Sequence, residues 1–238
     1  MKKQLFVIVF VIFSLQIFAQ TGTVSTEVLS REATVKIFSD SIKQKLNITY
    51  PIYRVYKCTD LTGLFYVVLT ESGDSLTPNN DTVNKSIRAL KITSTKNGLS
   101  KSWELNDFII KLVYGSGYES SLFFWPRYNE YTDLDGDNLI DPLVIYGTSG
   151  NDGYYDGRIK IIIYHKGAKI AIRHQNSPMD FERNTQVDKE FYDLPLKIQN
   201  KVKEIMLRME DDNRAIFPAG WQEAMKRKEL KFDENHHK

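Results

Sequence analysis

The amino-acid sequence predicts an α+β protein: a single β-rich domain of antiparallel hairpins, with helices near the N-terminus and at the C-terminus. The chain contains thirteen Tyr and thirteen Phe residues, and together with runs of Val and Ile these favour strands. Turn signals separate short apolar segments, and the strongest is Asn97-Gly98, because this pair suits a tight hairpin turn. Apolar residues at helical spacing occur in residues 30–47 and after residue 193, which places the helices at the two ends.

The first half of the chain predicts one helix followed by hairpins. Residues 30–47 are expected to form the helix, with Ser39 or Asp40 capping its final turns. The elements expected after it are strands 50–58 and 64–69 joined by a turn at 60–63, a polar loop at 71–84, strands 87–95 and 100–105 joined at 96–98, and a strand at 108–114.

The second half begins with an aromatic segment, residues 114–131, and ends with two helices. The elements expected between them are an acidic loop at 133–141, an apolar strand at 143–146, a glycine-rich loop at 147–157, and strands 158–164 and 169–174 joined at Lys166-Gly167. Helical spacing after Asp193 predicts a helix with this residue as its cap and Pro195 in its first turn. A shorter helix is expected at 221–230.

Residues 1–19 contain the three parts of a cleavable signal peptide. Lys2 and Lys3 supply positive charge, residues 5–18 are almost entirely apolar, and Ala19 is the small residue at which a peptidase would cut. The apolar stretch is shorter than the roughly 20 residues that cross a bilayer as a helix; an uncleaved anchor is the alternative. We therefore expect export to the periplasm, the cell surface or the medium, and no transmembrane segment in the mature chain.

Charge, length and cysteine content limit the class of protein. The formal net charge is +2, whereas binding to nucleic acid through bulk electrostatics needs a basic face, so no nucleic-acid partner is expected. Residues 20–238 are long enough for one domain with a substantial core, and a subdivision into 20–130 and 131–238 is the alternative. Cys58 is the single cysteine, and its alternating apolar surroundings favour a packed thiol over a reactive one.

The most specific chemical signal is a regular run of aspartates. Loop positions one, three, five and nine are occupied by Asp133, Asp135, Asp137 and Asp141, and the backbone carbonyl of Leu139 at position seven supplies a further oxygen. Carboxylates this close repel one another unless a cation neutralises them, and Ca²⁺ prefers six to eight oxygen ligands in flexible loops. The pattern lacks the final Glu of an EF-hand and resembles the calcium loops of integrin-type propeller repeats. It predicts a structural Ca²⁺ site; a solvated acidic hairpin without metal is the alternative.

Two weaker signals concern ligand binding. The aromatic segment includes Trp125 and Tyr128, which could form a platform for a sugar ring, although aromatic side chains more often pack in the core. The glycine-rich loop could line a ligand site beside the acidic loop, because one short strand separates the two loops; an ordinary hairpin loop is the alternative. The candidate residues at this loop are Asn151, Asp152, Tyr154, Asp156 and Arg158.

The sequence contains no recognisable catalytic constellation. His165 and His174 lie on adjoining predicted strands, but zinc needs three or four convergent ligands. Asp180 and Glu182 could pair for glycoside hydrolysis, yet carboxylates at such spacing are common by chance. The dense polar cluster at 173–183 is interpreted as a hydrogen-bonded structural knot. An enzymatic role is therefore not favoured.

Besides the aspartate loop, four motifs stand out in residues 131–232. They are Asp156-Gly157-Arg158-Ile159-Lys160, Ile172-Arg173-His174-Gln175-Asn176, Phe181-Glu182-Arg183-Asn184-Thr185 and Phe217-Pro218-Ala219-Gly220-Trp221-Gln222-Glu223-Ala224-Met225. With these motifs the region resembles a poorly characterised family of exported Gram-negative envelope proteins, linked by name to surface polysaccharide biosynthesis.

The resemblance implies a role in making or displaying surface glycans such as lipopolysaccharide or capsule, and the missing catalytic constellation favours a non-catalytic accessory or binding role. A glycan or another envelope protein is then the expected partner. A polysaccharide-active enzyme and a secreted inhibitor or immunity-type protein are the alternatives.

Overall fold

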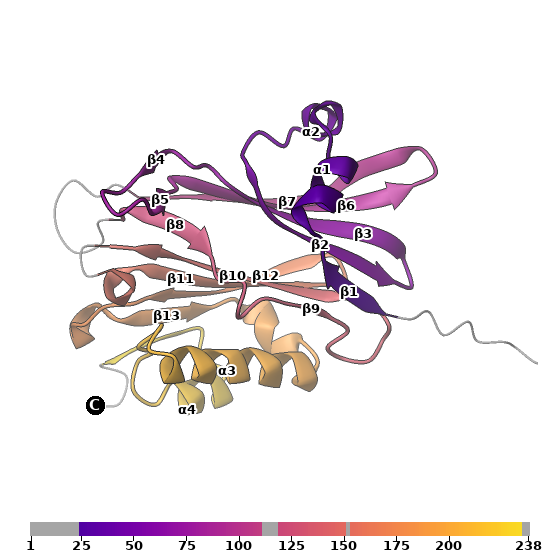
Figure 1. Ribbon diagram of the computed structural model, residues 1–238. Helices are drawn as coiled ribbons and strands as arrows, with labels where there is room; N and C mark the ends of the chain where they lie inside the picture. The colour runs from indigo at the N-terminus through magenta and orange to yellow at the C-terminus, as the bar shows by residue number, and fades with distance from the viewer. Residues whose placement is uncertain (1–23, 111–118, 151–152, 235–238) are drawn as a thin grey trace, which may run out of the picture.

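The structure is a computed structural model that describes residues 24–110, 119–150 and 153–234. The predicted signal peptide and most of the strand predicted at 108–114 lie outside these residues. Antiparallel sheets dominate the described chain, which is mostly β (Figure 1). In these three ranges, no helix combines the length and the apolar character needed to cross a membrane.

The first sheet has five antiparallel strands in the order β1-β2-β3-β6-β7. Its strands are β1 (Ser25–Val28), β2 (Ile52–Asp60), β3 (Gly63–Glu71), β6 (Ser86–Thr95) and β7 (Gly98–Phe108). The predicted hairpins β2–β3 and β6–β7 are confirmed. Their turns contain Gly63 and Gly98 at positive φ, a conformation that glycine adopts at no steric cost. The predicted polar loop at 71–84 contains a small ribbon of β4 (Ser75–Leu76) and β5 (Thr82–Val83).

The second sheet has the order β14-β13-β12-β11-β10-β8, and β9 also pairs with β10. Its strands are β8 (Ser121–Phe124), β9 (Glu130–Thr132), β10 (Asp141–Ser149), β11 (Arg158–His165), β12 (Ala168–Gln175), β13 (Asn184–Val187) and β14 (Lys231–Asp233). The predicted hairpin at Lys166-Gly167 is confirmed as β11–β12. The helical elements are the 3₁₀ helices η1 (Tyr154–Asp156), η2 (Asp180–Glu182) and η3 (Lys189–Asp193), and the α-helices α3 (Leu196–Asp211) and α4 (Trp221–Lys226).

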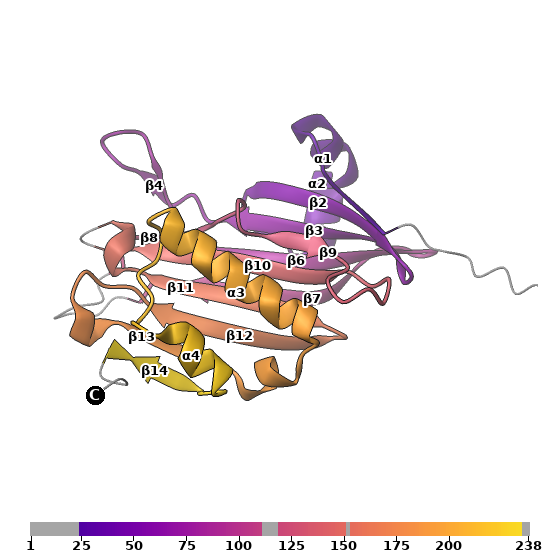
Figure 2. The same cartoon turned by 90° about the horizontal axis from the view of Figure 1, so that it is seen from below.

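Four layers stack in the molecule: α1 (Arg31–Ile37) with α2 (Asp40–Leu46), the five-stranded sheet, the seven-stranded sheet, and α3 with α4 (Figures 1 and 2). Strand β10 lies in the middle and is buried on both faces. Leu143 and Ile145 belong to the core beneath α3, whereas Val144 and Tyr146 belong to the core between the sheets, since successive side chains of a strand point to opposite faces. This double burial explains the uninterrupted apolar run at 143–146.

The predicted α+β class, with helices near the N-terminus and at the C-terminus, is wrong. Strand β1 precedes the first helix, β14 follows the last one, and the short 3₁₀ helices η1 and η2 lie between strands. All four residues of β1 are exposed, so no apolar alternation marks this strand in the sequence. It is a strand because it pairs with β2, and the three-residue β14 likewise depends on pairing with β13.

The helix predicted at 30–47 is two helices with a break at Phe38 and Ser39. The hydroxyl of Ser30 caps the first helix by accepting a hydrogen bond from the backbone N–H of Ala33 (3.2 Å). Phe38 leaves the helical conformation and packs its ring edge-on against Tyr66 of the first sheet. Burial of this ring therefore interrupts the helix that periodicity alone predicts.

The C-terminal helices also differ at their ends from the prediction. Asp193 is the last residue of η3, and Pro195 is the N-cap of α3, so the predicted cap at Asp193 is wrong. The helix predicted at 221–230 ends earlier, at Lys226.

Candidate metal loop and aromatic pocket

The acidic loop connects β9 to β10 and is wound around the carboxylate of Asp133. This carboxylate accepts hydrogen bonds from the backbone N–H groups of Gly136 (2.7 Å), Asp137 (3.1 Å) and Asn138 (2.8 Å). Gly136 and Asn138 both have positive φ, which glycine and asparagine tolerate best. Local aspartate-to-backbone bonds of this kind favour turns over regular structure, so the sequence of the loop determines its shape.

Three of the five predicted metal ligands converge. One carboxylate oxygen each from Asp133, Asp135 and Asp141 lies within 4.8 Å of the others, so together they could hold a metal ion. Asp137 is turned aside, because its carboxylate pairs with Lys166 Nζ (3.1 Å) and accepts the backbone N–H of Leu139 (2.9 Å). The structure therefore brings together three carboxylates, and the fourth is held by a lysine.

Asp141 is the buried member of this cluster, only 2% exposed. It accepts the backbone N–H of Leu134 (3.1 Å) and contacts His165 Nδ1 (2.7 Å). Burial raises the pKa of the Asp141 carboxyl, and the contact with His165 opposes part of that rise. A further cation, Lys197 of α3, donates to the backbone carbonyl of Asp135 (3.0 Å).

The basic residues around the loop were missed by sequence reasoning. His165 is the last residue of β11, Lys166 follows it in the turn to β12 and Lys197 lies in α3, so only the fold places them beside the aspartates. The ammonium groups of Lys166 and Lys197 reduce the repulsion between the carboxylates. The loop is also attached to the first sheet, because the Asp60 carboxylate accepts the backbone N–H of Ile140 (3.1 Å).

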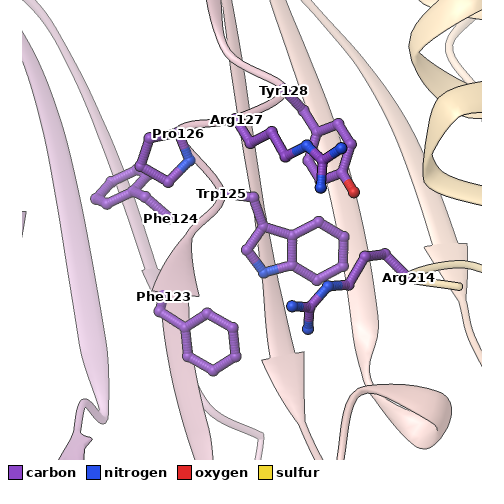
Figure 3. A pocket seen from close by; sticks show the side chains of 7 residues that line it. All are labelled: Phe123, Phe124, Trp125, Pro126, Arg127, Tyr128 and Arg214. Carbon is purple, nitrogen blue, oxygen red and sulfur yellow. The ribbon is translucent and has the colours of Figure 1, made fainter. Parts of the chain in front are cut away.

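The aromatic pocket is built on a tight turn that follows β8. The backbone N–H of Tyr128 donates to the carbonyl of Trp125 (3.0 Å), and Pro126 occupies the second position of the turn, where its fixed φ is favoured. A pocket of about 220 Å³ opens here (Figure 3). It is lined by Phe123, Phe124, Trp125, Pro126, Arg127, Tyr128 and Arg214.

The Trp125 indole lies against the backbone of β10. A Cβ added to Gly147 would lie 2.6 Å from Cζ2 of this ring, so a larger residue at 147 would displace the indole. Trp125 and Tyr128 are 7% and 3% exposed and belong to the core beneath α3. Most of each ring is therefore packed in the core, which is the alternative that the sequence analysis gave to a sugar platform. The small exposed part of each ring forms the pocket wall.

Arg214 reaches the pocket because of the way α3 ends. The backbone N–H of Arg214 donates to the carbonyl of Met209 (2.8 Å), and that of Asn213 to the carbonyl of Glu210 (2.9 Å). Asn213 has a φ of 54°. These are the two bonds and the left-handed residue of a Schellman motif. The motif reverses the chain and presents Arg214 beside the indole (Figure 3).

Asp212 fixes the other side of the pocket. Its carboxylate accepts the hydroxyl of Tyr128 (2.7 Å) and pairs with Arg127 (3.0 Å). Burial, together with the bond to Asp212, raises the pKa of Tyr128 to about 12, so the phenol remains a hydrogen-bond donor at physiological pH. Neither Asp212 nor Arg214 was recognised from the sequence, since both lie more than eighty residues from the turn.

The residues that line the aromatic pocket include none of the described residues of the glycine-rich loop. Asn151 and Asp152 lie outside the described residues, and Tyr154 and Asp156 belong to η1. The prediction that this loop lies beside the acidic loop is wrong. The two loops lie at opposite ends of the nine-residue strand β10, whose first and last residues are separated by roughly 26 Å at a rise of about 3.3 Å per residue.

Arg158 instead belongs to a charge network on the opposite face of the seven-stranded sheet. Its guanidinium pairs with Glu119, and its Nη2 also donates to the carbonyl of Phe108 (2.9 Å). Lys160 next to it pairs with Asp107 (2.7 Å). The two acidic and two basic side chains of this network neutralise one another, which suits a structural bridge between the sheets. Of the four residues, only Arg158 was singled out from the sequence.

His174, Glu182 and Cys58, which the sequence analysis also considered, have structural roles. His174 is 2% exposed, and its ring nitrogens contact Thr185 Oγ1 (3.0 Å) and Asn176 Oδ1 (3.3 Å), so the polar cluster at 173–183 includes the predicted hydrogen-bonded knot. Glu182 accepts the hydroxyl of Ser177 (2.7 Å). Cys58 is fully buried, and burial raises its thiol pKa to about 11, which confirms a packed thiol.

Comparisons of the chain with protein-family models, with curated proteins and with solved structures found no match.

Proposed function

We propose that this chain is an exported envelope protein with a non-catalytic binding role in making or displaying surface polysaccharide, and that a structural Ca²⁺ ion stabilises its acidic loop. The observation that carries the calcium site is the convergence of Asp133, Asp135 and Asp141 in a loop already wound by backbone hydrogen bonds. The signal peptide and the family resemblance of residues 131–232 support the export and the glycan link.

The loop suits a structural ion better than a catalytic one. It is attached to the first sheet through Asp60 and to α3 through Lys197, so an ion at its centre would stiffen a junction between layers. Ca²⁺ fits such a loop better than Mg²⁺, because Ca²⁺ accepts more ligands and irregular geometry, whereas Mg²⁺ demands a near-ideal octahedron. Asp137 and the Leu139 carbonyl would complete the ligand set once Asp137 leaves Lys166.

The test is a thermal melt of residues 20–238 in chelator, with graded Ca²⁺, and with Mg²⁺ as the control ion. Binding to the folded state alone raises the melting temperature with ion concentration, so we expect a rise with Ca²⁺ and a smaller one with Mg²⁺. The Asp135→Ala/Asp137→Ala variant should lose that rise. The control, Asp81→Ala/Glu190→Ala, removes two exposed acidic side chains that are not part of the acidic loop and should keep the rise. An identical melt in chelator and in Ca²⁺ would contradict the proposed site.

Export has a separate test. The full-length chain expressed in a Gram-negative host should accumulate outside the cytoplasm with Gln20 as its first residue, as measured by fractionation and N-terminal sequencing. A chain retained in the cytoplasm with Met1 intact would contradict the exported role and leave the calcium result unaffected.

A further inference from the structure

A groove opens between the beginning of β2 and α1, the helix that lies on the outer side of the first sheet (Figure 1). Its volume is about 480 Å³, within the range of roughly 300–1,000 Å³ that clefts for ligands occupy. Phe38 and Val55, each 1% exposed, form its floor. Its rim contains Val28, Val35 and Tyr53, which are 55%, 63% and 45% exposed. Exposed apolar side chains that gather at a cleft mark a surface for interaction.

Strand β2 has an open edge in this groove. β1 pairs with β2 as far as Val28 opposite Tyr56, and the backbone N–H of Leu29 adds one bond to the carbonyl of Val55 (3.0 Å). The chain then leaves the sheet to form α1, whereas β2 continues through residues 52–54. Among the described strands, only β3 pairs with that part of β2. An open strand edge is a template on which another extended chain can pair.

The charged side chains that line the groove are all basic. They are Arg31, Lys43 and Arg54, and none of the described residues lining the groove is acidic. Arg31 is exposed, and within the described chain no carboxylate forms an ion pair with it. Lys43 pairs with Asp40 (2.7 Å), whose side chain is 98% exposed, so solvent screens that pair. The groove therefore complements a partner that carries negative charge beside apolar side chains.

Helix α1 is only partly covered by the rest of the protein. None of its residues is buried, and Val35 on its groove side is the most exposed of the apolar rim. Its acidic residue Glu32 does not line the groove, and Glu27 of β1 is paired with Lys57 (2.7 Å). A partner in the groove would therefore cover apolar surface of α1 without meeting a carboxylate on the groove wall.

We infer that this groove binds an extended segment of a partner protein that contains both apolar and acidic side chains. The segment adds as a strand beside residues 52–54 of β2, its apolar side chains cover Phe38 and Val35, and its carboxylates pair with Arg31 and Lys43. In strand addition, backbone hydrogen bonds supply affinity and pockets for alternate side chains supply specificity. An anionic lipid shares the charge and the apolar character but cannot pair with a strand edge, so the open edge of β2 favours a peptide. This binding goes beyond the proposed function and depends neither on the calcium site nor on a glycan.

The test is fluorescence anisotropy of a labelled nonapeptide that repeats two valines and two glutamates, so that each face of the extended strand carries both. Titration with residues 20–238 should give saturable binding that weakens as salt is added, because salt screens exposed charges. Arg31→Gln/Lys43→Gln should weaken binding about tenfold, since two charge-assisted contacts are lost. The matched control, Lys36→Gln/Lys45→Gln, removes one exposed cation from each of the same two helices, and neither residue lines the groove. It should bind like the parent.

Two further comparisons separate the backbone from the charge. The same peptide with every second backbone N–H methylated keeps its side chains and should lose binding, because it cannot pair with β2. Val35→Glu brings a carboxylate to the rim of the groove and should abolish binding, whereas Val35→Lys should retain it. Because position 35 is 63% exposed, both variants should melt close to the parent, so a folding defect is distinguishable.

The opposite outcomes each overturn a defined part of this assignment. Equal binding of the methylated peptide would exclude strand addition, and equal binding of a peptide with lysine in place of glutamate would exclude charge complementarity. Sedimentation of the protein with phosphatidylglycerol vesicles, combined with no peptide binding, would make the groove a lipid site instead. Binding of neither peptide nor vesicles would overturn the inference altogether. A calcium-dependent melt without peptide binding would reject this groove and leave the proposed function standing.

Discussion

At the scale of single residues, His174 makes the protein sensitive to mild acid. Burial lowers the pKa of this imidazole to about 4 from an ordinary value of 6.5, so the folded protein holds it neutral while the unfolded chain protonates. The stability it contributes is therefore complete above about pH 6.5 and is lost progressively as the pH falls towards 4. A difference of about 2.5 pKa units corresponds to a free energy of unfolding on the order of 3 kcal/mol.

The His174→Gln variant tests this assignment. Its free energy of unfolding should fall less steeply than that of the parent between pH 6.5 and pH 4, because the buried imidazole of His174 is gone. Urea unfolding at intervals from pH 8 to pH 4 measures the difference, and the carboxylates common to both proteins cancel. Parallel pH profiles would show that His174 is not the group responsible.

Lys166 should compete with the proposed metal ion for Asp137. It pairs with Asp137 at 3.1 Å, and 57% of its side chain is exposed, so solvent screens the pair and the pair contributes little to stability. Lys166→Asn removes the charge but suits the left-handed backbone at this turn position (φ 47°). We expect this variant to bind Ca²⁺ about two- to fivefold more tightly, measured by competition with a chromophoric chelator. Lys166→Arg, which keeps the charge, should match the parent; a gain in both variants would refute the competition.

At the scale of elements, the C-terminus of α3 determines the geometry of the pocket. Asn213 adopts the left-handed conformation that closes the helix and orients Arg214. Asn213→Ala should lower the free energy of unfolding by about 1 kcal/mol, since a Cβ without a local hydrogen bond strains this conformation. Asn213→Gly should melt like the parent or higher. Chemical denaturation of the three proteins checks the order, and an alanine variant as stable as the parent would argue against the motif.

The elements that could be predicted from the sequence are those whose signals are local. The hairpins β2–β3, β6–β7 and β11–β12 follow from alternating apolar residues and turn glycines, and the shape of the acidic loop follows from its own aspartates. Strands β1 and β14 carry no such pattern, because pairing alone makes them strands. The candidate pocket could be predicted only in part: Trp125 and Tyr128 lie three positions apart in the sequence, whereas Arg214 joins them through the packing of α3 on the sheet.

At the scale of the whole molecule, the two sheets are joined by a buried charge network. Glu119, with 3% of its side chain exposed, pairs with Arg158, and Asp107 of β7 pairs with Lys160 of β11 (2.7 Å). Without Glu119, Arg158 keeps only its longer ion pair with Asp107 (3.5 Å), and breaking a buried pair typically costs about 3–5 kcal/mol. We therefore expect Glu119→Gln to lower the free energy of unfolding by roughly 3 kcal/mol, measured by urea denaturation.

A double-mutant cycle separates the pair from either residue alone. Adding Arg158→Met to Glu119→Gln removes the uncompensated charge, so the double variant should regain part of the lost stability. Single variants whose effects simply add would mean that the two groups do not act as a pair.

The place of β14 in the seven-stranded sheet has a consequence for the making of the protein. The five-stranded sheet is assembled from residues 25–108, whereas its neighbour requires a strand at 231–233 whose Phe232 is 2% exposed. As the chain is extended from its N-terminus, the first sheet can form while Val67, Leu69 and Leu105, which belong to the core between the sheets, still lack their cover. An incomplete chain therefore exposes a broad apolar surface, which is when aggregation and chaperone capture compete most strongly with folding.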